Sequence, residues 1–333
     1  MRFSKKTSAF AALLAASALV MAGCAGGEVV EEAPEGGAPA GDGEMYIALV
    51  SKGFQHQFWQ AVKTGAEQKA EELGVRVTFE GPAAETEIAQ QLDMLTTAIN
   101  SNPDAIGYAA LDPEACVAPL EQAKAKDIPV VYFDAPCNGD VGLSLAATDS
   151  KVAGALAAEH MAELIGGEGE VAIVGHSQIN STGVERRDGF VEKIEADFPN
   201  IKIVDIQYGD GDHLKSADIA KTMIAAHPNL KGIYGTNEGS AIGVVNAVKE
   251  LGLEKGKLTI IGFDSGAAQI AAIKDGTMAG AITQDPIGIG ARTVESAVAA
   301  ANGESIDEFY DTGSYWYDAT NIDDPKIADV LYE

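Results

Sequence analysis

Polar and aromatic side chains recur just after short apolar runs of the sequence, where they could bind a ligand. The first run, Met45 to Val50, is followed by the tip SKGFQHQFW. An apolar run of this length is typical of a strand buried on both faces of a parallel sheet. Open α/β sheets bind ligands in the crevice beyond the carboxyl ends of such strands. Because later runs carry the same kind of tip, we expect one shared site that contains Lys52, His56, Phe58, Trp59, Asp134, Arg186, Asn237, Asp264 and Gln284.

These side chains supply two carboxylates, a guanidinium, an ammonium, two amides and aromatic rings. A sugar presents adjacent hydroxyl groups that each donate and accept hydrogen bonds. Forked carboxylate and amide groups can therefore bind hydroxyl pairs, while an aromatic ring covers the apolar C–H face. The charges of Asp134 and Asp264 balance those of Lys52 and Arg186. This composition predicts a site for a neutral polyol rather than for a sugar acid or a phosphate.

Several of these residues also have a purely structural interpretation. Trp59 lies on the apolar stripe of the helix expected at 57–73, so we expect it to serve both the core and the site. Phe58 is the better candidate for stacking on a sugar. Lys52 could instead be a solvated loop lysine. Asp134 and Asp264 could merely cap helices, although each is the first charge after an apolar strand, which favours the site.

Strand and helix patterns alternate along the chain from residue 45. Strands are expected at 45–50, 75–80, 104–110, 129–134, 170–174, 201–207, 231–235, 258–263 and 279–283. Helices are expected at about 57–73, 86–101, 113–126, 150–165, 182–197, 213–227, 238–252, 266–275 and 287–301, followed by a strand through 315–317 and a short helix capped by Asp324. Such alternation predicts an α/β protein with parallel sheets. Two successive sets predict two similar Rossmann-like lobes.

The chain is expected to cross between these lobes near residues 148, 284 and 312, which gives a three-stranded hinge. The N-terminal lobe would then contain residues 45–148 and 285–312. The C-terminal lobe would contain residues 149–284 and 313–333.

Residues 1–23 have the pattern of an export signal, with a basic head, an apolar core and small residues before Cys24. The end of this segment is similar to a bacterial lipobox, which implies lipidation of Cys24; a simple cleaved signal is the alternative. Residues 24–44 contain six acids and no base, with little apolar bulk, so we expect a flexible tether. The formal net charge of −27 disfavours nucleic acid as a partner.

Two further cysteines, Cys116 and Cys137, follow two successive expected strands. Export places them in an oxidising compartment, where a disulfide can persist. The sequence leaves two interpretations open, a disulfide and two separate buried thiols, because it does not give the distance between their Cα atoms.

The chain from about 45 to 322 resembles the ribose, allose and galactose class of periplasmic binding proteins, the type I solute-binding fold of bacterial sugar ABC transporters. The matching stretches occur in the order of the family, and they are ALVSKGFQHQFW, PVVYFDAP, GVERRDGF, IYGTNEGSAIG, IIGFDSG and AGAITQDP. The resemblance implies that the sugar-contacting places of the family fall on the nine residues named above.

The resemblance also shows where this chain departs from the ribose-type pattern. Within the pair Arg186-Arg187, the family pattern selects Arg186. The ribose-type pattern has a serine at the place of Lys52, an arginine at Ala135 and an aromatic residue near Gly211. A lysine at the first place, with Phe-Trp beyond it, looks closer to the allose type. The identity of the sugar therefore stays open.

The sequence carries no serine-hydrolase elbow, zinc-protease, redox or nucleotide-binding motif. The segment 210–213 is too short for a calcium loop and is expected to form a turn and a helix N-cap. We therefore expect a binding protein without enzymatic activity, cofactor or metal. It would be a lipid-anchored, extracytoplasmic monomer that delivers a monosaccharide to the permease of an ABC importer.

Two alternatives remain at this point. One is a receptor of the same fold for a signalling sugar or a furanosyl signal molecule. The other is an exported glycosidase that uses Asp134 and Asp264 as acid and nucleophile. A sugar-responsive repressor of the same fold is disfavoured because the domain is strongly acidic and an export signal stands at the N-terminus.

Overall fold

The computed structural model describes residues 43–332. The expected export signal, Cys24 and nearly all of the expected tether lie outside the described residues. Within residues 43–332, no helix is both long enough and apolar enough to cross a membrane.

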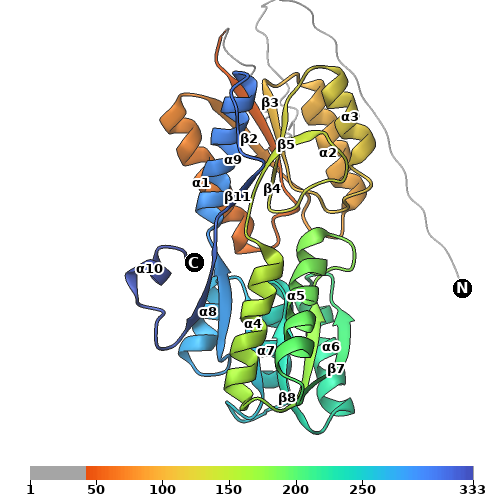
Figure 1. Cartoon of the computed structure of the whole chain (residues 1–333), viewed down its shortest axis with the longest axis vertical. Coiled ribbons are helices and arrows are strands. Elements are labelled where there is room, and N and C mark those ends of the chain that lie inside the picture. The colour runs from red at the N-terminus through yellow and green to blue at the C-terminus, as the bar shows by residue number, and fades with distance from the viewer. Residues whose placement is uncertain (1–42, 333) are drawn as a thin grey trace, which may run out of the picture. The chain divides into compact units, whose positions relative to one another are not determined.

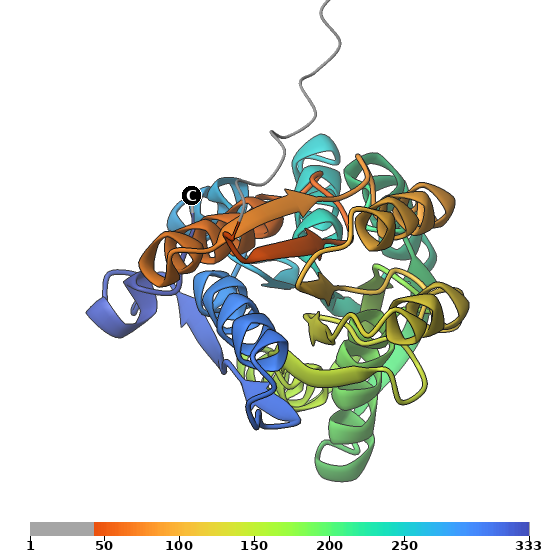
Figure 2. The ribbon, with the colours of Figure 1, turned by 90° about the horizontal axis from the view of Figure 1, so that it is seen from above.

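The first sheet belongs to the N-terminal lobe, the upper one in Figure 1. Its strands are β1 (Tyr46–Val50), β2 (Arg76–Glu80), β3 (Ala105–Tyr108), β4 (Val130–Phe133), β5 (Gly142–Ala147) and β11 (Phe309–Asp311). They pair in the order β11-β5-β4-β3-β1-β2, and each pair is parallel. The helices of this lobe are α1 (Gln57–Leu73), α2 (Ile88–Asn100), α3 (Val117–Ala125) and α9 (Pro286–Ala301). Figure 2 shows α1 and α9 on one face of the sheet and α2 and α3 on the other.

The second sheet repeats this order in the C-terminal lobe. Its strands are β6 (Gly169–Gly175), β7 (Ile201–Tyr208), β8 (Leu230–Gly235), β9 (Thr259–Phe263), β10 (Gly280–Gln284) and β12 (Ser314–Asp318). They pair in the order β12-β10-β9-β8-β6-β7, and only β12 is antiparallel to its neighbour. The helices are α4 (Ser150–Ile165) and α5 (Ser181–Asp197) on one face, and α6 (His213–Ala226), α7 (Glu238–Glu250) and α8 (Ala267–Lys274) on the other.

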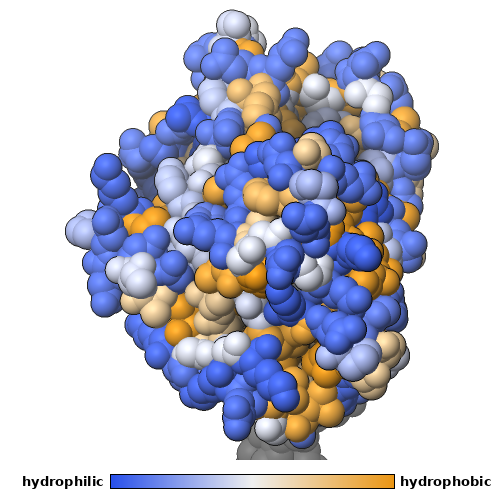
Figure 3. All heavy atoms as spheres, turned by 60° about the horizontal axis from the view of Figure 1, so that its bottom comes forward, coloured by the Kyte–Doolittle hydropathy of each residue, from blue (hydrophilic) through white to orange (hydrophobic). Residues whose placement is uncertain are grey.

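Both faces of the central strands are buried, as their unbroken apolar runs predict. In β1, the side chains of Ile47 and Leu49 pack toward α1 and α9, whereas Ala48 and Val50 pack toward α2. The face of the molecule in Figure 3 is mostly hydrophilic, with hydrophobic residues in groups between the hydrophilic ones. Within this apolar interior, the ends of the strands are the places where polar side chains are buried.

The prediction of two α/β lobes with mainly parallel sheets is confirmed, and β5 and β11 are the strands that it missed. The run of β5, GLSLAA, lacks the β-branched and aromatic residues that mark strands, and β11 has only three residues. Both lie at one edge of the sheet, where pairing rather than composition defines a strand. The short last helix, α10 (Pro325–Ala328), begins as predicted, because Asp324 accepts a hydrogen bond from the Lys326 N–H.

Three connections join the lobes: β5 to α4, β10 to α9, and β11 to β12. The first and third are tied together, because the Thr148 hydroxyl donates to the Gly313 carbonyl at 2.9 Å. In the N-terminal lobe, a disulfide joins Cys116 to Cys137, with 6.1 Å between their Cα atoms.

Each lobe contains a pair of helices that touch through glycine. In the pair α4 and α5, a Cβ atom on Gly154 would lie 2.4 Å from the Arg186 carbonyl oxygen, and one on Gly189 would lie 2.1 Å from that of Lys151. In the pair α1 and α9, a Cβ atom on Gly290 would lie 2.0 Å from the Val62 carbonyl oxygen. These contacts hold the helices at a fixed separation, and the first one also fixes the place of Arg186.

We expect Gly154→Ala to lower the free energy of unfolding by about 1–3 kcal/mol, because the added methyl group overpacks the α4–α5 contact. An unhindered glycine in a helix would show the opposite sign, a gain of about 0.5–1 kcal/mol. Urea denaturation measures the difference, and Val152→Ala, at an exposed position of the same helix, is the control. A more stable Gly154→Ala variant would show that the two helices do not touch there.

Candidate functional site

The nine residues predicted from the sequence line one cavity, together with Glu85 and His176. In this form the cavity leaves about 20 Å³ of space for the centres of water molecules. Its walls come from both lobes, with Lys52, His56 and Asp134 on the N-terminal side and Arg186 and Asp264 on the C-terminal side. The role of these residues as ligand contacts is a proposal that rests on the geometry described below.

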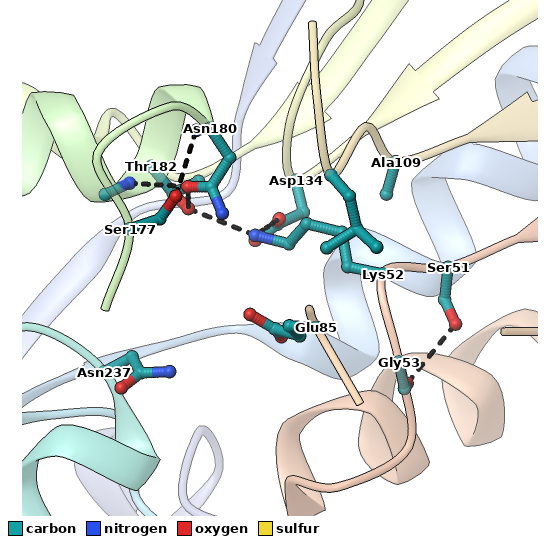
Figure 4. A network of polar contacts seen from close by, with 12 residues as sticks. Ser51, Lys52, Gly53, Glu85, Ala109, Asp134, Ser177, Asn180, Thr182 and Asn237 are labelled. Carbon is teal, nitrogen blue, oxygen red and sulfur yellow. Dashed lines mark hydrogen bonds and ion pairs between the residues drawn. The ribbon is translucent and has the colours of Figure 1, made fainter. Parts of the chain in front are cut away.

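Lys52 is not a solvated lysine, because its side chain is buried and ion-paired. Its Nζ lies 2.8 Å from Asp134 Oδ2 and donates to Thr182 Oγ1 of the other lobe at 3.1 Å. Figure 4 shows the ammonium group between Asp134 and the Thr182–Asn180 pair. Lys52 therefore connects the two lobes across the cavity.

His176 continues this connection into the C-terminal lobe. Its Nε2 lies 3.2 Å from Thr182 Oγ1, and its Nδ1 lies 2.7 Å from Thr236 Oγ1. Burial and the nearby Arg186 guanidinium lower the pKa of His176 well below its ordinary value. The ring is therefore neutral at neutral pH, and it joins two hydroxyl groups without adding a charge.

The sequence left open whether Asp264 caps a helix or lines the site, and in the structure it does both. Its Oδ2 accepts from the backbone N–H of Glu238, the first residue of α7, at 3.0 Å, and its Oδ1 accepts from Gln284 Nε2 at 2.7 Å. Asn237 likewise caps α7, through the Ser240 N–H, while it lines the cavity. The segment 210–213 forms the predicted N-cap, with Asp212 accepting from the Lys215 N–H. Among residues 43–332, no group of three or more His, Cys, Asp or Glu side chains could hold a metal ion.

Arg186 faces inward and Arg187 outward, as the family pattern implied. The guanidinium of Arg186 lies 3.7 Å above the centre of the Phe263 ring and donates through Nη1 to the Thr236 carbonyl at 3.1 Å. Arg187 instead donates to the Tyr208 hydroxyl. Arg186 Nε is buried and has no hydrogen-bond partner among the described residues. Buried polar groups are normally hydrogen-bonded, so this donor is an exception.

A second unpaired donor belongs to His56. Its Nε2 lies 2.8 Å from the amide nitrogen of Gln55 and 3.4 Å from that of Asn237. Amide NH2 groups only donate, so Nε2 is the acceptor and the proton resides on Nδ1. Within residues 43–332 no group accepts from this buried Nδ1. Burial lowers the pKa of His56, so the ring stays neutral at neutral pH.

Phe58 and Trp59 form an aromatic pair beside the cavity. Trp59 belongs to both the core and the cavity wall, as the sequence predicted. Trp59 is 1% exposed, packs against Phe133 and donates from Nε1 to Glu85 Oε1 at 2.7 Å. Phe58 meets Trp59 edge to face, with 4.9 Å between ring centres, and also lines the cavity. Phe58 is thus positioned by Trp59, and Trp59 in turn orients Glu85.

Two lining residues, His176 and Glu85, were not predicted from the sequence, and Glu85 changes the charge of the site. His176 directly follows β6, so the strand-end signal could have identified it. Glu85 lies five residues beyond β2 in a loop that also holds Glu87, and nothing in the pattern distinguishes it. Burial favours the neutral form of Glu85, but Lys52 and His56 outweigh it and lower the pKa, so the carboxyl is ionised. The expected balance of charges is therefore wrong, because three carboxylates face two cations.

The place near Gly211, where the ribose-type pattern has an aromatic residue, is filled by polar groups. A Cβ atom on Gly211 would lie 3.1 Å from the amide nitrogens of Gln55 and Asn237 and 3.2 Å from His56 Nε2. Any side chain here would displace these groups. This wall of the cavity is therefore hydrogen-bonding rather than aromatic.

Two further contacts hold the lobes together beside the cavity. The carboxylate of Glu238 accepts from the backbone N–H groups of Gln57 and Phe58, at 3.2 and 3.4 Å, at the start of α1. In return, Gln57 Oε1 accepts from the Ala267 N–H at the start of α8. The structure is therefore a closed form, with side chains of each lobe bound to helix N-termini of the other.

Two lobes of this topology around a closed cleft are typical of proteins that bind a ligand between their lobes. Comparisons with known proteins place the chain in such a family. The family model "Periplasmic binding protein domain" matches residues 47–305, and the chain belongs to this family. The D-allose-binding periplasmic protein of Escherichia coli K12 is 32% identical over 267 residues, which cover 78% of this chain and 85% of that protein.

Solved structures of solute-binding proteins are also similar to this chain. A carbohydrate transporter solute-binding protein from Agrobacterium radiobacter, in complex with D-arabinose, has a TM-score of 0.84 and 30% identity, and the match covers 88% of this chain and all of that one. An ABC transporter solute-binding protein from Agrobacterium vitis, with bound D-fucose, has a TM-score of 0.83 and 34% identity over 86% of this chain and all of that one.

Glu238 makes the closing of the lobes dependent on pH. Burial, with Asp264 nearby, raises the pKa of Glu238 to about 7 in this closed form. Opening would return the carboxyl to water, where an ordinary glutamate has a pKa of about 4.3. Closing therefore takes up a proton between these values, so closure is most favourable at low pH and is weakened as the pH rises to about 7.

We expect any ligand held between the lobes to lose up to about tenfold in affinity per pH unit from about pH 5 to pH 7. Titration calorimetry at pH 6 in two buffers of different ionisation enthalpy should reveal uptake of a proton on binding. Glu238→Gln, which keeps the shape of the side chain, should abolish both effects. Equal heats in the two buffers for the unaltered protein would contradict the role given to Glu238.

Proposed function

We propose that this chain is the substrate-binding protein of an ABC importer and that it binds a neutral monosaccharide, a pentose, hexose or related polyol, between two closing lobes. The observation that carries the proposal is the pair of unpaired buried donors, His56 Nδ1 and Arg186 Nε, in the cavity between the lobes. A bound hydroxyl group would satisfy each of them. The relatives support the ligand class, since two of the solved structures hold D-arabinose and D-fucose.

The size and charge of the cavity narrow the ligand further. Little free space remains between the lobes in this closed form, about 20 Å³ for the centres of water molecules, so the site is suited to a small ligand. The excess of carboxylates over cations repels sugar acids and sugar phosphates. Carboxylate and amide forks can hold hydroxyl pairs, with Phe58 against a C–H face.

The lobes, 45–148 with 285–312 and 149–284 with 313–333, would open and close about the three connections between them. Sugar bridging the two sets of strand ends would favour the closed form, and the closed form would dock on the permease. The named relatives are binding proteins, and we propose no enzymatic activity for this chain.

We expect Asp264→Ala to weaken sugar binding by about 10- to 150-fold, because a hydrogen bond to a charged group contributes about 1.5–3 kcal/mol. Calorimetry with the best-bound neutral monosaccharide measures the change. Asp93→Ala, which removes an exposed carboxylate from α2, should leave the affinity unaltered. If Asp264→Ala binds as tightly as the unaltered protein, Asp264 does not contact the ligand.

We further propose that Cys24 is lipidated and that residues 25–44 tether the domain to the cell membrane on its outer side. The small residues before Cys24 and the acidic segment after it support this proposal. Expressed in bacteria, the full chain should sediment with membranes and dissolve in detergent, whereas Cys24→Ala should not. Ala25→Ser, which keeps the cysteine, is the control. Recovery of the unaltered chain in the soluble fraction would contradict the anchor.

A further inference from the structure

A second cavity, which we call the outer groove, adjoins the sugar cavity. It holds about 280 Å³ and shares two lining residues, Glu85 and His176, with the inner cavity. Its walls come from the loops after β2, β3, β6 and β7 and from the start of α2. In each sheet, β2 or β7 forms the edge opposite to the strands of the hinge. The outer groove therefore lies at the mouth of the cleft.

The outer groove persists although the lobes are already closed. Lys52 reaches Thr182, and Glu238 binds the N-terminus of α1, so side-chain contacts limit any closer approach of the lobes. Figure 4 shows Glu85 on the far side of the space from Lys52 and Asp134. A ligand that filled the inner cavity would thus leave the groove beside Glu85 open to a substituent.

The walls of the groove match a neutral, hydroxyl-rich group. Thr86, Ser177 and Gln178 supply hydroxyl and amide groups, and Glu85 supplies an acceptor. Ile88, Leu111 and Ile179 supply aliphatic surface. The lining residues include two carboxylates, Glu85 and Asp210, but no lysine or arginine, so the groove is unsuited to an anionic substituent.

We propose that the ligand extends from the inner cavity into the outer groove, so that the protein accepts a disaccharide or a sugar linked to a polyol. One unit would occupy the inner cavity, and the second would lie between Glu85 and Ile179. This inference rests on the proposed function, because the inner cavity must hold a sugar for the groove to hold its substituent.

The test compares mono- and disaccharides by calorimetry. A panel of neutral monosaccharides first identifies the unit that binds best. Disaccharides that carry this unit, linked through each of its hydroxyl groups in turn, are then titrated. We expect at least one of them to bind within about tenfold of the monosaccharide or more tightly.

A variant then locates the second unit. Ile179 is 51% exposed, so Ile179→Trp should fold normally and fill the groove. We expect this change to weaken the disaccharide by about tenfold or more, with less than about a twofold change for the monosaccharide. Leu164→Trp, at an exposed position of α4, is the matched control, and thermal melting confirms that both variants are folded.

The proposal is overturned if every disaccharide binds about 100-fold more weakly than the monosaccharide. It is also overturned if Ile179→Trp affects both ligands equally, or if it slows association without changing affinity, since the groove would then be an entrance only. In each of these cases the monosaccharide still binds and the proposed function stands. If no carbohydrate of either size binds, the proposed function itself fails.

Discussion

Charged groups that leave water must be paired or hydrogen-bonded, and this requirement governs how the two lobes meet. Lys52 is buried because Asp134 neutralises it and Thr182 of the other lobe accepts its second hydrogen bond. Asp264 is buried because a helix N-terminus and an amide both donate to it. When the lobes separate, water can replace Thr182, whereas Asp134 stays with Lys52 and the partners of Asp264 stay in its own lobe. The cleft can therefore open without leaving a bare charge in the interior.

The two lobes meet this requirement in the same way, because they share one strand order. Asp134 follows β4 and Asp264 follows β9, at equivalent places in the two sheets. Both adopt positive φ angles, 59° and 79°, which non-glycine residues rarely do. Each also donates its backbone N–H to the neighbouring strand, to Ala146 and Ile282 respectively. The strained backbone is held by the sheet, and the carboxylate is turned away from the strand and into the cleft.

The sequence allowed the fold and most of the candidate site to be predicted, for a physical reason. Buried parallel strands must be continuously apolar, so the first polar residue beyond each one is conspicuous, as Asp134 and Asp264 are. Glu85 was not predicted because a hydrogen bond from the Trp59 indole, rather than a strand end, positions its side chain. The burial of Lys52 could not be predicted either, because it depends on Asp134, which follows another strand. The strand β5 was missed because pairing with β4 and β11, and not its composition, makes it a strand.

The closed form is stabilised by weak, reversible contacts rather than by a large apolar interface. Glu238 places a carboxylate at the N-terminus of α1, where the helix dipole and two N–H groups favour it. Burial nevertheless raises the pKa of Glu238 to about 7, so desolvation outweighs that gain for the ionised carboxyl. A protein that must release its ligand needs such a balance, because closure that was strongly favourable without ligand would not respond to it.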